Sequence, residues 1–269
     1  MAEPIQTRSL IAEAWRSGLA ALAPNALWLV LFALLMGGWN ASTADAGRIA
    51  ITAVLAGLAF AAGVRLSLGL YRSLLSTHSG TLLSLAHANL AVALGFGFIA
   101  FFILFFCGAF GVMMLHLSGL VDLAAEPDAA TVSAAQARLY GTPYGAALIL
   151  VALAGAAALA FVSLRLLIFA PITVAASKAN VFRTWPLTKG RLLPLALAAL
   201  ATYAAPLVAG LIAARLVGAH LPETIAGYFG RGVLLVIFLT PFLLAGHGFA
   251  AATYHRLKPE PEPAPAELG

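Results

Sequence analysis

Charged residues are scarce in this sequence. Asp, Glu, Lys and Arg account for only 9% of its 269 residues, whereas hydrophobic residues account for 62%. Soluble globular proteins contain about 25% charged residues, because a chain folded in water needs polar side chains to cover its core. With a mean hydropathy of +0.98, the composition excludes an ordinary water-soluble fold and predicts a protein whose surface faces lipid.

Cysteine and catalytic motifs are also in short supply. Cys107 is the single cysteine, which excludes an internal disulfide and a multi-cysteine metal site. The sequence contains no GxSxG, no HExxH, no GxGxxG and no glycine-rich phosphate loop, the motifs that mark common hydrolase and nucleotide sites. We therefore expect no catalytic residue, no metal site and no cofactor. An intramembrane enzyme built from dispersed residues is the least favoured alternative.

Acidic residues and histidines are rare inside the long apolar runs. No Asp or Glu lies within any of these runs, although cation-coupled transporters usually place a carboxylate at depth. Of the 6 histidines, only His247 lies deep in an apolar run, and no candidate metal ligands lie near it in sequence. We expect its side chain to make a hydrogen bond between helices.

What the sequence has in abundance is long apolar runs, six in all. Each approaches or exceeds the roughly 20 residues that a helix needs to cross a hydrocarbon core of about 30 Å. None shows the alternating pattern of a membrane β-barrel strand. The sequence therefore predicts an all-α, polytopic transmembrane helical bundle in a single membrane domain over residues 1–258. The predicted spans are about 22–39, 49–70, 88–117, 144–170, 192–217 and 232–254.

Three shorter segments outside the runs have patterns of their own. Residues 1–20 place apolar side chains such as Ile11, Trp15 and Leu19 on one helical face, which predicts an amphipathic helix lying in the membrane interface. The longest external loop contains "EPDAATVSAAQARLY", which predicts a short helix after Pro127 because proline favours the first turn of a helix. Prolines at alternate positions predict a disordered tail over residues 259–269.

The first apolar run also has some features of a signal peptide. Arginines precede it, and Ala44-Asp45-Ala46 has small residues at the spacing of a cleavage site. The stretch before the run, however, is about 20 residues long and contains Glu3 and Glu13, unlike the compact basic region of a signal peptide. We therefore expect the first run to be retained as a span.

The basic residues separate by side when the six runs are taken as spans. Excess Lys and Arg mark the cytoplasmic side of short loops, so both termini are predicted to lie inside, in a bacterial inner membrane. The basic residues are not gathered into a stripe of the kind that binds nucleic acid, so we expect no nucleic-acid partner. The richer side holds Arg8, Arg16, Arg65, Arg72, Arg165, Lys178, Arg183, Lys189, Arg191, Arg256 and Lys258, and the poorer side holds Arg48, Arg138, Arg215 and Arg231.

Arg65 and Arg165 are notable charges, because each follows a long uncharged stretch and precedes further apolar sequence. Arg65 and Arg72 are seven residues apart, so they share a helix face. Together with Arg165 they are candidates for a basic pocket that binds a lipid headgroup or another anion. The simpler interpretation, which stays open here, is that all three anchor the topology from the cytoplasmic ends of their helices.

The residues after the fourth run form a recognisable pattern, "RLLIFAPITVAASKANVFRTWPLTKGRLLPLAL". A helix containing Arg165 runs to Pro171, a polar segment follows, and Leu-Thr-Lys-Gly at 187–190 opens the next span. This pattern resembles the membrane-domain family attached to some bacterial glycerophosphodiester phosphodiesterases, and the stand-alone relatives of that family. The chain departs from it at "ITVAASKA", where acidic residues are usual, and at Pro186. Its expected interface-motif residues are Arg183, Trp185, Lys189 and Arg191.

The resemblance implies an integral membrane domain, since the diesterase chemistry belongs to a separate soluble domain. We therefore expect a non-enzymatic membrane protein with a structural or assembly role, or one that interacts with lipids, and membrane lipids as its partners. A second copy of the chain or another membrane protein is an open alternative as partner. The alternative function is a small transporter or channel for a neutral or anionic solute. A polar cavity lined by the arginines would favour transport, whereas a solid bundle packed through Ala and Gly would favour the first function.

Overall fold

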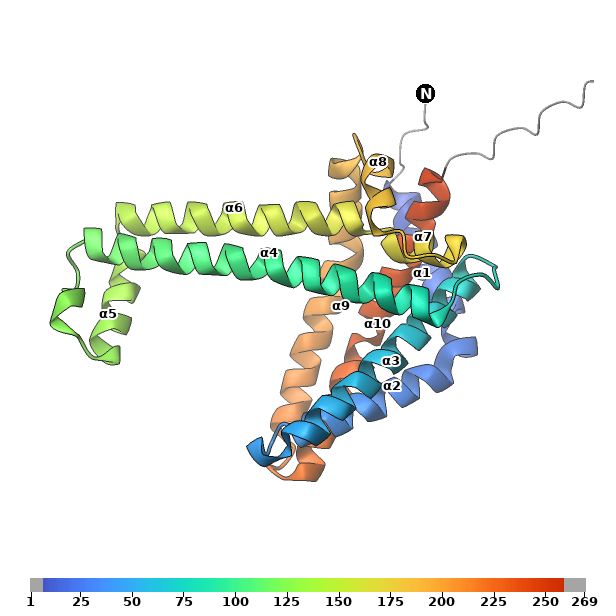
Figure 1. The fold of residues 1–269 in the computed structure, drawn as a ribbon, viewed down its shortest axis with the longest axis horizontal. Coiled ribbons are helices and arrows are strands. Elements are labelled where there is room, and N and C mark those ends of the chain that lie inside the picture. Colours follow the sequence, from blue (N-terminus) through green and yellow to red (C-terminus); the bar gives the residue numbers. More distant parts are fainter. Residues whose placement is uncertain (1–6, 259–269) are drawn as a thin grey trace, which may run out of the picture. The chain divides into compact units, whose positions relative to one another are not determined.

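The computed structural model describes residues 7–258, and the predicted tail at 259–269 lies outside them. The described residues are almost entirely helical and contain no strand, so the predicted all-α fold is confirmed. Figure 1 labels the α-helices. In chain order the elements are α1 (Thr7–Ala20), α2 (Leu22–Ser42), η1 (Ala46–Arg48), α3 (Ile49–Leu74), α4 (Leu82–Leu117), η2 (Leu123–Ala125), α5 (Ala129–Leu139), α6 (Pro143–Leu166), α7 (Phe169–Ala176), η3 (Val181–Arg183), α8 (Thr184–Leu187), α9 (Leu192–Ala219) and α10 (Ile225–Leu257).

Six helical segments among the described residues are long and apolar enough to cross a membrane, which confirms the predicted number of spans. Several extend beyond their predicted limits. For example, α3 continues to Leu74 and α4 begins at Leu82, so a polar residue near the end of a span is still part of its helix. The six segments are Leu22–Ser42, Ile49–Leu74, Leu82–Leu117, Pro143–Ala176, Leu192–Ala219 and Ile225–Leu257.

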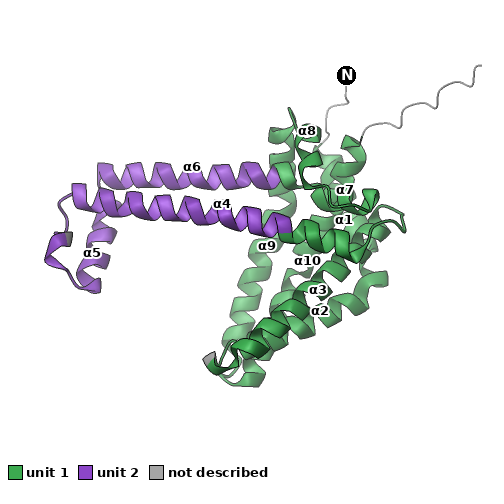
Figure 2. Cartoon of the chain, viewed as in Figure 1, with its two compact units in different colours: residues 1–90, 165–269 green, residues 91–164 purple. Residues whose placement is uncertain are grey.

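The chain divides into two compact units (Figure 2). Unit 1 comprises Met1–Leu90 and Arg165–Gly269, and its described part holds α1, α2, α3, the first turns of α4, and α7 to α10. Unit 2 comprises Ala91–Leu164, with the rest of α4, the short helix α5 and most of α6. Each unit has its own cluster of buried apolar side chains.

In unit 1, α10 is the central helix, and α1, α2 and α9 all pack along it (Figure 1). The approach is close because glycines meet the backbone of the neighbouring helix. Gly37 of α2 lies against Gly232 of α10, and Gly210 of α9 faces the Phe238 carbonyl of α10. Helices in lipid associate through small residues that allow this close approach. The Gly- and Ala-rich runs of the sequence therefore build the bundle.

Contacts near the helix ends show that α2 runs antiparallel to both α3 and α10. At one end, Asn25 near the start of α2 donates a 3.3 Å hydrogen bond to the Ser73 hydroxyl near the end of α3. At the other end, Asn40 near the end of α2 donates a 2.7 Å hydrogen bond to the Tyr228 carbonyl near the start of α10. Arg231 of α10 also lies there, bonded to the end of α9. We call the first end the α1 end, because α1 packs there, and the second the Arg231 end.

The N-terminal helix that the sequence predicted is present as α1, and one stripe of it packs against the bundle. Leu10, Ala14 and Gly18, spaced four residues apart, are buried, and Gly18 fits against the backbone of α10 at Leu244. Leu19, on the apolar face that the sequence predicted to meet the membrane interface, is 55% exposed. The small side chains at positions 14 and 18 bring α1 close to α10, and this favours a narrow contact stripe over a broad apolar face.

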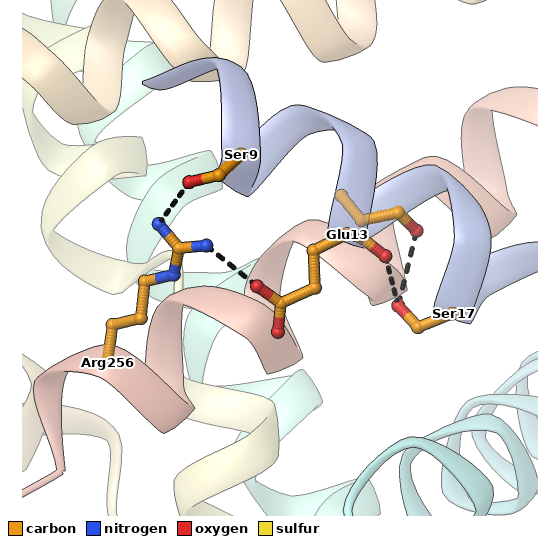
Figure 3. A network of polar contacts seen from close by, with 5 residues as sticks. Ser9, Glu13, Ser17 and Arg256 are labelled. Carbon is orange, nitrogen blue, oxygen red and sulfur yellow. Dashed lines mark hydrogen bonds and ion pairs between the residues drawn. The ribbon is translucent and has the colours of Figure 1, made fainter. Parts of the chain in front are cut away.

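Polar contacts fasten α1 to the end of α10 (Figure 3). Arg256 of α10 donates one hydrogen bond to the Ser9 hydroxyl at 3.2 Å and another to the Glu13 carboxylate at 2.8 Å. Ser17 in turn donates to the Glu13 backbone carbonyl at 2.7 Å. Because these groups are partly exposed, the ion pair contributes orientation more than stability.

The fourth predicted span is not one continuous helix. α6 ends at Leu166, and α7 begins at Phe169 after a short turn. Pro171 explains the break, because it has no N–H to bond the carbonyl of Leu167 and its ring crowds that carbonyl. Pro206 and Pro241, by contrast, lie inside α9 and α10, which stay continuous.

Unit 2 contains the short helix that the sequence predicted after Pro127. Asp128 is the N-cap of α5, and its carboxylate accepts a 2.7 Å hydrogen bond from the Thr131 backbone N–H. Hydrogen bonds from Thr131 lower the pKa of Asp128; the side chain of Thr131 has the larger effect and its backbone N–H the smaller. Ala135 and Leu139 of α5 are buried in a small apolar cluster with residues at the end of α4.

Candidate functional site

Arg65 lies on α3 where that helix packs against α2. Its guanidinium carbon stands 4.6 Å from the centre of the Trp28 ring on α2, a distance typical of a cation–π interaction. Arg65 precedes Leu74, the last residue of α3, by nine residues, which is about 13 Å along a helix axis. The side chain is half-buried. Its charge therefore lies within the helical span and not in the following loop.

Further polar groups surround this arginine. Asn25 is only 5% exposed, and its amide donates to the Ala21 carbonyl at 2.9 Å and to the Ser73 hydroxyl at 3.3 Å. Gly69 leaves the space that these side chains occupy, because a Cβ there would collide with the Asn25 side-chain oxygen and approach Nη1 of Arg65 to 3.4 Å. We call Asn25, Trp28, Arg65 and Ser73 the Arg65 niche.

The Arg65 guanidinium makes no hydrogen bond and no ion pair with any residue between 7 and 258. A guanidinium carries five N–H donors, and a charge held in a membrane span is costly unless it is compensated. Phosphate and carboxylate oxygens are the acceptors that match its planar fork. The niche is therefore suited to bind an anionic group that reaches the α2–α3 pair.

Arg72, seven residues further along α3, has a different role. Its Nε donates to the Ser79 carbonyl at 3.2 Å and its Nη2 to the Gly80 carbonyl at 2.7 Å. Both acceptors belong to the loop between α3 and α4, and the Gly80 N–H is bound in turn by the Ser177 hydroxyl at 2.8 Å. Arg72 therefore holds a loop in place.

Arg165 is 8% exposed and its guanidinium is directed at the short helix α8. Nη1 donates to the Trp185 carbonyl at 3.0 Å and to the Thr188 hydroxyl at 3.3 Å. The guanidinium carbon also lies 5.3 Å from the centre of the Trp185 ring. Residues from both halves of the pattern that carries the family resemblance thus meet in space, and the arginine joins the end of α6 to α8.

The other interface-motif residues lie on the surface around α8. Arg183 and Lys189 are exposed, Trp185 is 42% exposed, and Arg191 is half-buried at the N-cap of α9. Exposed basic and aromatic side chains at the start of a span are typical of the membrane–water interface. Arg183 also borders a cavity of about 300 Å³ whose other lining residues are Ile172, Ala175, Ala176, Pro186, Leu187 and Tyr254.

The three candidate arginines therefore have separate sets of partners and do not form one pocket. Arg72 and Arg165 use donors on backbone carbonyls, whereas Arg65 keeps its donors available beside Trp28. Sequence reasoning missed Trp28 and Asn25 as neighbours of Arg65. The available signal was that both lie in the first two turns of the span that precedes α3 in the chain, where an antiparallel partner of Arg65 has to be.

His247 makes the helix–helix hydrogen bond that the sequence predicted. Its Nε2 lies 2.9 Å from the Ser67 hydroxyl of α3, and its Nδ1 lies 2.8 Å from the Leu243 carbonyl of its own helix. The Tyr71 ring is 4.9 Å away. Among residues 7–258, no group of three or more His, Cys, Asp or Glu side chains is arranged to hold a metal ion. His247 is accounted for by the packing of α3 on α10.

Six membrane-competent helices indicate that the chain is a multi-pass α-helical membrane protein. Comparison with known proteins adds no relative: no family model, no curated protein and no solved structure matches the chain.

Proposed function

We propose that this chain is a non-enzymatic, lipid-binding protein of the bacterial inner membrane, with its N- and C-terminal ends on the cytoplasmic side. In this proposal it is a relative of the membrane-domain family that the 165–190 segment resembles. The observation that carries the proposal is the Arg65 guanidinium, which is half-buried against Trp28 and keeps its hydrogen-bond donors free of protein acceptors among residues 7–258. Its ligand is the phosphate of an anionic lipid in the cytoplasmic leaflet.

The depth of Arg65 supports a lipid over a soluble anion. About 13 Å of helix separates Arg65 from the end of α3, so an anion that contacts it has to enter the headgroup region or below. Basic residues near an anionic leaflet gain about 1 kcal/mol each, and hydrogen bonds to a charged group are worth about 1.5–3 kcal/mol. A lipid phosphate in the niche would gain both of these favourable contributions.

The packing of unit 1 favours this function over a transport pathway. α1, α2 and α9 approach α10 through glycines that touch backbone, which leaves a solid helix contact along the centre of the unit. Arg72 and Arg165 are engaged by loop and turn carbonyls. A transport pathway for an anion would need arginines that line a continuous polar cavity.

A direct test uses the fluorescence of Trp28 to report whether an anionic lipid binds at the neighbouring Arg65. The chain has 4 tryptophans, so replacing Trp15, Trp39 and Trp185 by Phe leaves Trp28 as the single fluorophore. The protein is reconstituted in zwitterionic vesicles that contain a minor fraction of brominated-chain phosphatidylglycerol or brominated-chain phosphatidylcholine. We expect Trp28 to be quenched preferentially by the anionic lipid, with a local enrichment of about tenfold, the equivalent of one charge-assisted hydrogen bond.

Arg65→Gln should abolish that preference while leaving the protein folded, because the guanidinium binds no acceptor in the described part of the chain. Arg16→Gln is the matched control: Arg16 is exposed on α1, and its loss removes the same charge without touching the niche. Equal quenching of Trp28 by the two brominated lipids in the parent protein would refute the proposal. Anion flux through protein-containing vesicles that Arg65→Gln blocks would replace it with the transport function.

A further inference from the structure

A groove of about 690 Å³ lies at the Arg231 end of unit 1. Its lining residues come from α2, α9 and α10, where α2 and α9 both pack on α10. Its volume falls in the range of about 300–1,000 Å³ that is typical of small-molecule sites. Neither the family pattern nor the Arg65 niche includes any of its lining residues, so the groove is a separate feature of the fold.

On each of the three helices, the residues that line the groove change from polar or charged at the Arg231 end to apolar one turn deeper. Arg215 of α9 lies one turn nearer the Arg231 end than Leu211, and Arg231 of α10 lies one turn nearer that end than Leu235. On α2 the same step separates Asn40 from Met36. One turn of helix rises about 5.4 Å. The groove therefore has a polar, positively charged mouth and apolar walls below it, which is the profile of an amphiphilic ligand.

The two arginines at the mouth are differently engaged. Arg231 is fixed: its Nε donates to the Gly218 carbonyl at 3.1 Å, its Nη2 donates to the Leu221 carbonyl at 2.8 Å, and its guanidinium lies 5.0 Å from the Tyr228 ring. Arg215 is exposed and makes no hydrogen bond or ion pair with any residue between 7 and 258. Neither arginine is neutralised by a described carboxylate. The mouth therefore carries two uncompensated positive charges.

Aromatic side chains stand beside these charges. Trp39 and Tyr228 both line the groove, and tryptophan and tyrosine are enriched where a membrane protein meets the headgroups. A group bound at the mouth would lie at this level, with any acyl chain passing down between Met36, Leu211 and Leu235.

We propose that this groove binds the phosphate of an anionic lipid at Arg215 and Arg231, with an acyl chain of the same lipid along its apolar walls. The site lies at the opposite end of unit 1 from the Arg65 niche and so serves the opposite leaflet. It adds a second lipid site to the function proposed above and does not rest on the first.

The test uses a different tryptophan, so that the two sites are read separately. Replacing Trp15, Trp28 and Trp185 by Phe leaves Trp39 in the groove lining as the single fluorophore. In vesicles with brominated-chain phosphatidylglycerol or phosphatidylcholine, we expect Trp39 to be quenched preferentially by the anionic lipid. The preference should fall about tenfold in Arg215→Gln, since a charge-assisted contact to phosphate is lost.

Two further variants and one competitor make the result specific. Ala214→Phe fills the groove beside Arg215 and should reduce quenching by the anionic lipid, whereas Arg138→Gln, which removes an exposed arginine of unit 2, should leave it unchanged. Inorganic phosphate at millimolar concentration should compete weakly, because it gains nothing from the apolar walls.

Each other outcome overturns the proposal. If phosphate abolishes the preference and Ala214→Phe has no effect, the mouth binds a free anion and the lipid assignment fails. If Trp39 shows no preference for the anionic lipid, or Arg215→Gln keeps it in full, the groove is not a phosphate site. Because Trp28 reports the Arg65 niche independently, failure at either site leaves the lipid preference measured at the other unaffected.

Discussion

Two arginines near the ends of apolar helices show how surroundings decide the role of a residue. Arg165 is buried and is held by the carbonyl and hydroxyl groups of residues 185–188. Arg65 has only the face of Trp28 beside its guanidinium. A buried charge that is held by protein acceptors is costly to disrupt, whereas one that keeps its donors available calls for an external anion. The first is structural, and the second is the basis of the proposed lipid site.

Replacing Arg165 should therefore destabilise the protein even though no ligand is involved. Arg165→Gln removes the guanidinium that donates to the Trp185 carbonyl and the Thr188 hydroxyl, which we expect to lower the free energy of unfolding by about 1–3 kcal/mol. Unfolding by sodium dodecyl sulfate in mixed micelles measures the change. Arg183→Gln, at an exposed position in the same segment, should have little effect. Equal stability of the two variants would contradict a structural role for Arg165.

At the scale of the helical element, glycine determines how closely two spans approach. A Cβ at Gly232 would come within 2.6 Å of the Met36 carbonyl and 2.8 Å of the Gly37 Cα. Backbone cannot move aside as a flexible side chain can, so α2 and α10 would have to separate. Gly57 of α3, by contrast, has nothing within 4 Å of its Cβ position and faces open space.

These two glycines give a matched pair of variants. Gly232→Ala should destabilise the bundle by about 1–3 kcal/mol, the usual cost of overpacking. Gly57→Ala should be neutral or slightly stabilising, because alanine is the better helix former. Resistance to denaturing detergent compares them under one condition. A Gly232→Ala protein as stable as the parent would show that α2 does not contact α10 closely.

The start of α5 should respond to acid. The pKa of Asp128 is lowered in the folded protein by hydrogen bonds from Thr131, so the ionised cap stabilises α5 at all pH values above the unfolded pKa of about 3.9. That contribution is lost as the pH falls through the lower, folded value. The Thr131 amide resonance, followed by NMR in detergent micelles, should titrate with a midpoint below about 3.9. A midpoint at or above this value would contradict the cap.

At the scale of the whole molecule, the sequence predicted what depends on composition and length. The six spans and the short helix after Pro127 follow from apolar runs and helix-start signals, which act locally. The break before Phe169 is not visible in hydropathy, because the run 144–170 is uninterrupted, whereas Pro171 acts on a backbone carbonyl four residues earlier.

The candidate site was less predictable than the spans, for a related reason. Sequence reasoning singled out Arg65, but its neighbours Asn25 and Trp28 come from another helix. Likewise, the pairing of Arg215 with Arg231 depends on how α9 and α10 align. Which side chains meet across two helices depends on how far the helices are shifted along, and rotated about, their axes. Neither quantity can be predicted from a single sequence whose helices have Leu and Ala on every face.

Both lipid proposals depend on which helix ends lie on which side of the membrane. Membrane-impermeant maleimide labelling of single cysteines, introduced into a Cys107→Ala background, tests this directly. Suitable exposed positions at the α1 end are Ser79 and Lys178, and suitable exposed positions in the loops expected on the other side are Ala44, Glu126 and Glu223.

We predict that cysteines at Ala44, Glu126 and Glu223 are labelled in intact cells. Those at Ser79 and Lys178 should be labelled only after the membrane is permeabilised. Labelling at Ser79 or Lys178 in intact cells would contradict the six-span arrangement with both ends in the cytoplasm. So would the absence of labelling in intact cells at Ala44, Glu126 or Glu223.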